Sequence, residues 1–152
     1  MNIDEYSQLI KEEFLYLFEE YHFSFVYIRE HQNRFTVFRI GLQSDMCKIL
    51  FVREQGAGVP FLGTLNAPFE NEMTDQWVSL IGLLSYILKT DFNWSFLNNI
   101  PSSQRVQSSL SFSSKQFRPH CRQMIEMCAS QESMANWKPT YKQYVKEKIR
   151  RP

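Results

Sequence analysis

The chain of 152 residues has a net charge of +1, with 43% hydrophobic and 22% charged residues. These values are ordinary for a globular protein and exclude a disordered chain, so we expect one α+β domain over residues 1–152. The N-terminus opens on MNIDEYS, and the stretch WVSLIGLLSYIL is far shorter than the roughly 20 residues of a membrane span. We therefore expect neither a secretory signal nor a membrane-spanning helix.

The first expected helix runs from about Asp4 to Tyr21, because Asp4 is a good N-cap and its carboxylate suits a helix N-terminus. Apolar residues recur along this segment at the spacing of one helix face: Tyr6, Leu9, Ile10, Phe14, Leu17, Phe18 and Tyr21. Four glutamates flank that stripe: Glu12, Glu13, Glu19 and Glu20. We interpret them as a solvated face, because no His or Cys accompanies them at metal-ligand spacing.

Residues 23–53 read as three apolar segments of about eight residues, joined by two short polar breaks. Aromatic and β-branched residues dominate them, which predicts a three-stranded antiparallel meander. Neither face of this meander is cleanly polar, although a sheet with one wet side should alternate more strictly. Two interpretations follow. Either helices cover parts of both sides, which we favour, or one side is partly exposed as a contact surface.

The glycines of residues 54–73 suggest a phosphate-binding loop, but the residues that would hold phosphate are missing. Gly58, Gly63 and Thr64 have Walker A spacing without the lysine between them, and Pro60 removes a backbone donor. We expect a turn and then a short edge strand or loop around residues 59–65.

The main core helix is expected from Thr74, as N-cap, to Lys89. Its apolar residues form a strong face: Trp77, Leu80, Ile81, Leu84, Ile87 and Leu88. Gly82 lies in the helix interior, where glycine costs roughly 1 kcal/mol relative to alanine. We therefore expect this helix to pack on one face of the meander, with Gly82 marking close packing against the sheet.

Residues 91–114 are rich in Ser and Asn, and we predict a loop followed by a strand near residues 106–112, with a flexible linker as the alternative. A helix is expected next, over residues 115–130, with Ser113 and Gln116 at capping-box spacing. Cys121 and Cys128 would share a face of it at about 10 Å, which is too far to bridge. With Cys47 they make an odd number of cysteines, so reduced, inert thiols in a cytoplasm are expected.

The last segment predicts a basic amphipathic helix over residues 139–150, with Pro139 at its first position, which makes the C-terminal third helical. Trp137, Tyr141, Val145 and Ile149 recur every four residues. The adjacent basic ridge and the chain end supply the candidate partner-binding residues: Lys138, Lys142, Lys146, Arg150 and Arg151.

This basic helix has two possible roles. Residues 1–114 hold 8 basic and 13 acidic side chains, a net charge of −5, whereas residues 115–152 hold 9 basic and 3 acidic ones, a net charge of +6. The helix can dock on the acidic body, where the glutamates of the first helix are plausible neighbours. A detached helix would instead bind nucleic acid or an anionic surface. We favour docking, because a wet apolar stripe forfeits roughly 1.5–3 kcal/mol for each large aliphatic side chain.

The order of a helix, three meandering strands and an amphipathic helix over residues 4–90 resembles small uncharacterised bacterial α+β proteins. Immunity proteins for secreted toxins and secretion-chaperone-like domains have this general pattern. The resemblance implies a binding role rather than catalysis. It rests on the order of elements and not on a motif that can be aligned residue by residue.

The functional prediction is a non-enzymatic protein-binding or regulatory module. His22, His31 and His120 are scattered, and motifs such as GxSxG, HExxH or paired CxxC are absent, so no catalytic residue, cofactor or metal is predicted. We expect a protein partner, with self-association into a homodimer as a further option. The alternatives are nucleic-acid binding through the basic helix and an enzyme whose site uses scattered groups, for instance the meander's arginines: Arg29, Arg39 and Arg53.

Overall fold

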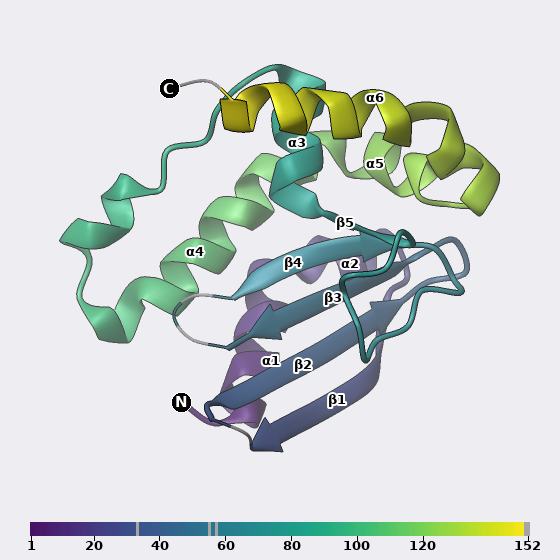
Figure 1. Ribbon diagram of the computed structural model, residues 1–152. Coiled ribbons are helices and arrows are strands. Elements are labelled where there is room, and N and C mark those ends of the chain that lie inside the picture. Colours follow the sequence, from purple (N-terminus) through teal and green to yellow (C-terminus); the bar gives the residue numbers. More distant parts are fainter. Residues whose placement is uncertain (33, 55, 57, 151–152) are drawn as a thin grey trace.

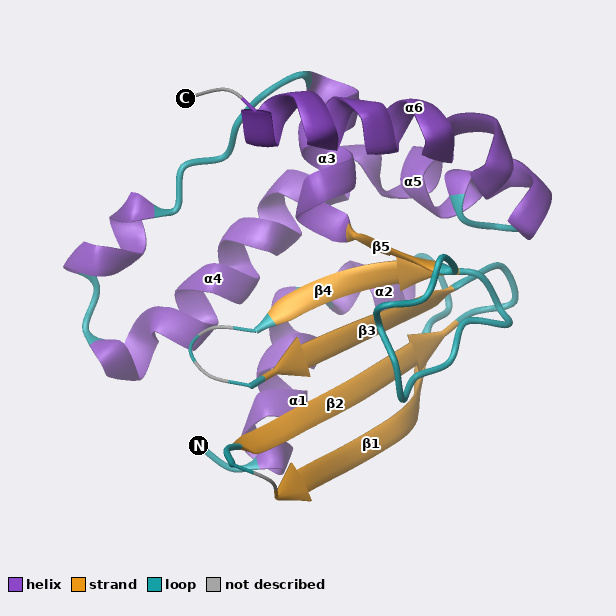
Figure 2. Cartoon of the chain, viewed as in Figure 1, coloured by secondary structure: helices purple, strands orange, loops and turns teal. Residues whose placement is uncertain are grey.

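The computed structural model describes residues 1–32, 34–54, 56 and 58–150, and it has an α+β fold in which helices cover one face of a sheet (Figure 1). Within these residues the sheet has five antiparallel strands whose order in space follows their order in the chain (Figure 2). The strands are β1 (Ser24–Gln32), β2 (Thr36–Gln43), β3 (Lys48–Arg53), β4 (Val59–Gly63) and β5 (Trp77–Ser79). The helices are α1 (Ile3–Glu13), α2 (Leu15–Glu19), α3 (Leu80–Leu88), α4 (Ser102–Phe117), α5 (Cys121–Met127) and α6 (Gln131–Arg150), with 3-10 turns η1 (Ser95–Asn99) and η2 (Arg118–His120).

The predicted N-terminal helix exists but is divided in two. Its N-cap is Asn2, whose side-chain oxygen accepts a hydrogen bond from the backbone N–H of Glu5 at 2.8 Å, and the predicted cap Asp4 lies inside the first turn. The helix is interrupted at Phe14, between α1 and α2. The Phe14 ring is fully buried and meets the ring of Phe51 at 5.1 Å between centroids. The apolar stripe therefore predicted the buried face correctly, while the predicted cap and the prediction of one continuous helix were wrong.

The three-stranded meander is confirmed as β1–β3, with β4 and β5 extending it to five strands. Ile40 pairs with Phe51 and Leu42 with Ile49, so the buried side chains of β2 and β3 share one face. The strand predicted near residues 59–65 is β4, which pairs with β3. It is not the edge strand that we expected, because β5 pairs with its other side. Helices α1 and α2 lie behind this face in Figure 1 and, with α3, α4 and α5, bury it in the main core.

The predicted helix over residues 74–89 begins later than expected. Trp77–Ser79 form β5, and α3 begins at Leu80 because the Ser79 hydroxyl accepts the N–H of Gly82 at 3.1 Å. Trp77 and Val78 face opposite sides of the sheet, and both are buried. An apolar pair of this kind fits a helix stripe as well as a buried strand, so periodicity could not separate the two. Helix α3 packs against β4 and β5, at one end of the sheet.

The strand predicted near residues 106–112, and the linker alternative, are both wrong, because these residues lie in α4. Its buried side chains follow helical spacing: Val106, Ser109, Leu110, Ser113, Ser114 and Phe117. Several of the buried positions of α4 are serines, whose side chains are small. The Tyr16 hydroxyl donates to the carbonyl of Ser114 at 3.0 Å. The capping-box prediction at Ser113 fails for the same reason, since Ser113 is inside the helix.

The predicted helices over residues 115–130 and 139–150 have different bounds in the structure. Residues up to Phe117 belong to α4, the turn η2 contains Pro119, and α5 follows. Helix α6 already begins at Gln131, where the Ser130 hydroxyl accepts the N–H of Ser133 at 3.0 Å, so Pro139 lies inside the helix. Pro139 is therefore not at the first helical position, as predicted, although an interior proline is costly. Met134, earlier in the same helix, is fully buried.

The described helices include none that is both long and apolar enough to cross a membrane.

Candidate functional site

The face of the sheet opposite the helices is covered only in part among the described residues. A loop of residues 64–76, between β4 and β5, lies in front of this face in Figure 1. Beneath it is a second, smaller core of Leu50, Ala67, Phe69 and Trp77. The favoured interpretation, in which helices cover parts of both sides of the meander, is therefore wrong among the described residues: on this face a loop covers part of the sheet, and other side chains stay exposed. The partial exposure agrees with the alternative, and its use as a contact surface stays a prediction.

The covering loop is fastened to the sheet by side chains from three strands. Arg39 on β2 donates to the carbonyl of Phe69 at 3.1 Å and pairs with the carboxylate of Glu72 at 2.6 Å. Lys48 on β3 donates to the carbonyl of Ala67 at 2.9 Å, and the indole N–H of Trp77 donates to that of Pro68 at 2.8 Å. Burial lowers the pKa of Lys48, which stands over the Phe69 ring. These bonds hold the loop in one position.

Two glycines allow the rings of the loop to lie directly on the strands. A Cβ on Gly41 would come within 2.4 Å of the Phe69 ring, and one on Gly63 within 2.5 Å of the Trp77 ring. Phe69 also stacks on Tyr27, with 5.2 Å between ring centroids. The sequence therefore specifies the covered half of the face with glycines on the strands and aromatic rings opposite them.

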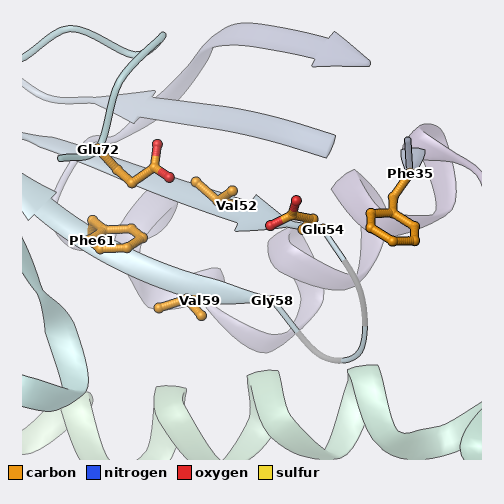
Figure 3. A pocket seen from close by; sticks show the side chains of 7 residues that line it. All are labelled: Phe35, Val52, Glu54, Gly58, Val59, Phe61 and Glu72. Carbon is orange, nitrogen blue, oxygen red and sulfur yellow. The ribbon is translucent and has the colours of Figure 1, made fainter. Parts of the chain in front are cut away.

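The uncovered half forms a hollow of about 470 Å³, which we call the open hollow (Figure 3). Its floor and rim carry the apolar side chains of Phe35, Val52, Val59 and Phe61. Phe35 is 43% exposed and Val59 47% exposed. Large side chains of this kind, gathered in a concavity rather than scattered, are typical of a binding surface.

Two carboxylates line the open hollow and give it negative charge. Figure 3 shows Glu72 beside Phe61 at one end, and Glu54 between Val52 and Phe35 toward the other. Glu72 is already paired with Arg39, whereas Glu54 is exposed. The described part of the chain holds no group of three or more His, Cys, Asp or Glu side chains that would bind a metal ion. The arrangement suits recognition of a surface that is apolar and partly cationic.

The arginines named for a scattered enzyme site do not converge. Arg39 fastens the loop, and Arg29 lies over the ring of Tyr27. Arg53 pairs across the strands with Phe38, on the helix-covered face, and its Nε donates to the carbonyl of Gly56 at 3.0 Å. The three guanidinium groups thus have separate partners on two faces of the sheet.

The three cysteines are free and fully buried. Burial raises the pKa of Cys121 and of Cys128 to about 12, and it raises the pKa of Cys47 further still. All three thiols are therefore protonated at neutral pH, which makes them poor nucleophiles. The structure assigns these side chains to the core, in agreement with the expectation of inert thiols.

The basic C-terminal helix is docked rather than detached. Trp137 donates its indole N–H to the carbonyl of Met127 at 2.9 Å, and the Tyr141 hydroxyl lies 2.7 Å from the position that a Cβ on Gly82 would take. Helix α6 crosses over α3 and lies beside α5 in Figure 1. Gly82 thus marks close packing against α6 and not, as predicted, against the sheet. Ile149, the last member of the predicted stripe, is 78% exposed.

Two of the candidate partner-binding lysines are occupied within the chain. Lys138 donates to the backbone carbonyls of Asp75 and Trp77, and burial lowers its pKa. Lys142 pairs with the Asp75 carboxylate at 3.1 Å, and this hydrogen bond lowers the pKa of Asp75. Asp75 therefore takes the place of the first-helix glutamates that we expected as neighbours.

The remaining candidates lie toward the end of α6. Lys146 and Arg150 are exposed, and Arg151 lies outside the described residues. Their neighbour Lys148 pairs with Asp91 at 2.5 Å. The basic ridge is thus divided into an occupied part near Asp75 and an exposed part near the chain end.

Sequence reasoning did not find the open hollow. Its residues come from the β1–β2 hairpin, the β3–β4 hairpin and one loop, so their proximity depends on strand register and on the path of residues 64–76. The signal in the sequence was the mixed polarity of both faces of the meander, which indicated a contact surface without locating it.

Comparison with known proteins adds no identification, since no protein-family model, no curated protein and no solved structure matches the chain.

Proposed function

We propose that this chain is a non-enzymatic protein-binding module and that the open hollow is its contact surface. The observation that carries the proposal is the exposed apolar concavity on a sheet face whose other half is firmly covered. Partial cover of this kind leaves large apolar side chains exposed to water. Burying them against a partner would contribute favourable free energy to binding. An immunity-protein or chaperone-like role would be one form of such binding.

Nucleic-acid binding through α6 has less support. Lys138, Lys142 and Lys148 are engaged by Asp75 and Asp91 of the same chain. A phosphate group would have to displace these contacts before it could pair with any of these three lysines. An enzyme is also less well supported, because the two carboxylates of the open hollow lie in an open concavity and one of them is committed to Arg39.

The proposal is tested by site-specific photocrosslinking in the native host. A photoreactive amino acid replaces Val59 in the open hollow or, as the control, Leu15 on α2, which is similarly exposed at 43%. We expect a discrete protein adduct from position 59 that is absent from position 15. The Val59→Asp variant, expressed as an untagged competitor, should fail to reduce the adduct, whereas the wild-type competitor should reduce it.

Identical adduct patterns from the two positions would contradict the proposal. The same holds if Val59→Asp competes as well as the wild type while keeping a normal melting temperature. Val59 is half exposed, so the substitution should leave folding intact, and circular dichroism of the variant checks this.

A further inference from the structure

The open hollow continues around the edge of β4 into a second concavity. This second concavity, which we call the edge hollow, has a volume of about 410 Å³ and shares Gly58 and Val59 with the open hollow. In Figure 3 the helix below Val59 is α4, whose Ser109 and Ser113 line the edge hollow. One short segment of a partner can therefore reach both hollows by passing over Val59.

The edge hollow is apolar, and its shape comes from segments distant in the sequence. Ile81 of α3, Trp94 and Leu97 of the η1 region, and Val59 of β4 form its walls. The two serines of α4 keep its floor low because their side chains are small. Such a cavity suits one large apolar side chain, which is how interface anchors are usually held.

The backbone of β4 at this place is poorly suited to pairing with an added strand. β5 pairs with Phe61, Leu62 and Gly63, so β4 continues past it at Val59 and Pro60. Proline has no N–H, and within sheets it is placed where the missing donor faces the open edge. A strand laid along this edge would thus lack a donor at Pro60. The occupant must be held mainly by its side chains.

The charge of the joined groove selects the chemistry of the occupant. Among the described residues that line the two hollows, the charged ones are Glu54 and Glu72, and both are acidic. Glu72 has a partner in Arg39, which leaves Glu54 as the exposed carboxylate beside the apolar floor. An exposed carboxylate next to accessible apolar surface favours a lysine or arginine in the bound segment and disfavours an acidic one.

We infer that the groove formed by the two hollows binds a partner segment that carries one basic side chain for Glu54 and one large apolar side chain for the edge hollow. This inference rests on the proposed function, since it names the chemistry recognised at the same surface. It goes further in assigning the recognition to two separate anchors and in extending the site to Leu97 and Trp94.

The test selects a random peptide library displayed on phage against the wild-type protein, with depletion on the Val59→Asp variant. Two variants then probe the anchors. Glu54→Lys reverses the charge, with Glu30→Lys on exposed β1 as its control, and Leu97→Gln makes the edge hollow polar, with Leu15→Gln as its control. Enriched peptides should pair Lys or Arg with an aromatic or large aliphatic residue. Glu54→Lys and Leu97→Gln should each weaken binding of these peptides about tenfold, and the two controls should not.

Two results would overturn the inference. Peptides that depend on Val59 but lack basic residues and ignore Glu54→Lys and Leu97→Gln would leave the proposed function in place and refute the two-anchor recognition. Failure to enrich any peptide over the Val59→Asp protein also refutes it, and the photocrosslinking experiment then decides separately whether the surface binds a protein at all.

Discussion

Individual glycines determine how closely the covering loop lies on the sheet. A Cβ on Gly41 would lie only 2.4 Å from the Phe69 ring, and the same ring stacks on Tyr27. Phe69 is nearly buried, and the loop around it is held by Arg39, so the ring cannot move away without breaking other contacts. A side chain at position 41 must therefore displace the loop or strain the strand.

We predict that Gly41→Val lowers the free energy of unfolding by about 1–3 kcal/mol, the usual cost of overpacking. Urea denaturation followed by circular dichroism measures the loss. Combining it with Phe69→Ala makes room for the valine, so the double variant should lose less stability than the sum of the two single variants. Strict additivity of the two losses would show that the ring does not restrict position 41.

The buried thiols predict how stability depends on pH. Burial raises the pKa of Cys121 and Cys128 to about 12, while thiols of the unfolded chain ionise at about 8.5. Above that pH the unfolded chain loses protons that the folded chain keeps, so the free energy of unfolding decreases as pH rises. The full contribution of these thiols is present at neutral pH and is lost on the alkaline side.

We expect the urea midpoint to decrease between about pH 8 and about pH 9, where thiols of the unfolded chain ionise and most ordinary tyrosines are still protonated. In Cys128→Ala the decrease should be shallower, because one of the buried thiols no longer contributes. Denaturation curves at matched ionic strength give the comparison. An equal slope in both proteins would mean that Cys128 ionises normally in the folded chain.

At the scale of elements, the contact between α3 and α6 depends on one missing side chain. A Cβ on Gly82 would lie 2.7 Å from the Tyr141 hydroxyl and 3.2 Å from the Ser79 Cβ. Glycine in a helix usually costs up to about 1 kcal/mol relative to alanine. Its presence here indicates that close approach of the two helices is worth more than helix propensity.

Gly82→Ala should therefore destabilise the protein, although alanine is the better helix former. Tyr141→Phe removes the hydroxyl that would clash and is predicted to restore part of the loss when combined with Gly82→Ala. Thermal unfolding of the two single variants and the double variant tests this coupling. If Gly82→Ala raised the melting temperature by itself, the two helices would have to be farther apart than the structure places them.

Helix α4 shows why the element assignment was incomplete from the sequence. Serines alternate with Leu110 and Phe112, and this period of two imitates a half-buried strand. In the structure Ser109, Ser113 and Ser114 are buried against neighbouring elements, so they belong to the apolar face despite their hydroxyls. A prediction that counts only apolar residues cannot recognise a helix face on which small polar residues are buried because of their size.

At the scale of the whole molecule, ion pairs connect the acidic body with the basic C-terminal segment. Asp75 pairs with Lys142 and Asp91 pairs with Lys148, both lysines of α6. Glu20 pairs with Arg118 at 3.1 Å. Residues distant in the sequence thus form ion pairs within one chain. Part of the charge asymmetry seen in the sequence is thus compensated within the chain.

Deletion of residues 137–152 tests this arrangement. The loss of Trp137 and Tyr141 from the surface of α3 and α5 should lower the melting temperature by about 5 °C or more, since each kcal/mol corresponds to about 2–4 °C in a chain of this size. Retention on heparin should be low in both proteins and change little. Trp137→Ala is the milder companion variant. An unchanged melting temperature with lost heparin retention would support nucleic-acid binding instead.

The sequence predicted the elements better than it predicted the surface. The meander followed from β-branched and aromatic segments, and the docking of the basic helix followed from its apolar stripe. The open hollow depends on the path of residues 64–76. Hydrogen bonds from Arg39 and Lys48 fix this path, and two glycines on the strands leave room for its aromatic rings. Those contacts join residues that are separated in the chain, and local periodicity carries no information about them.

The consecutive order of the strands has a consequence for folding kinetics. Each strand of the sheet pairs with its neighbour in the chain, so β1 to β4 can form through short-range contacts. The helical layer is different, because Tyr16 reaches Ser114 across 98 residues of chain. Long loops are closed at an entropic cost before their contacts contribute. The sheet is therefore expected to assemble first, and the union of the N-terminal helices with α4 is expected to limit the rate.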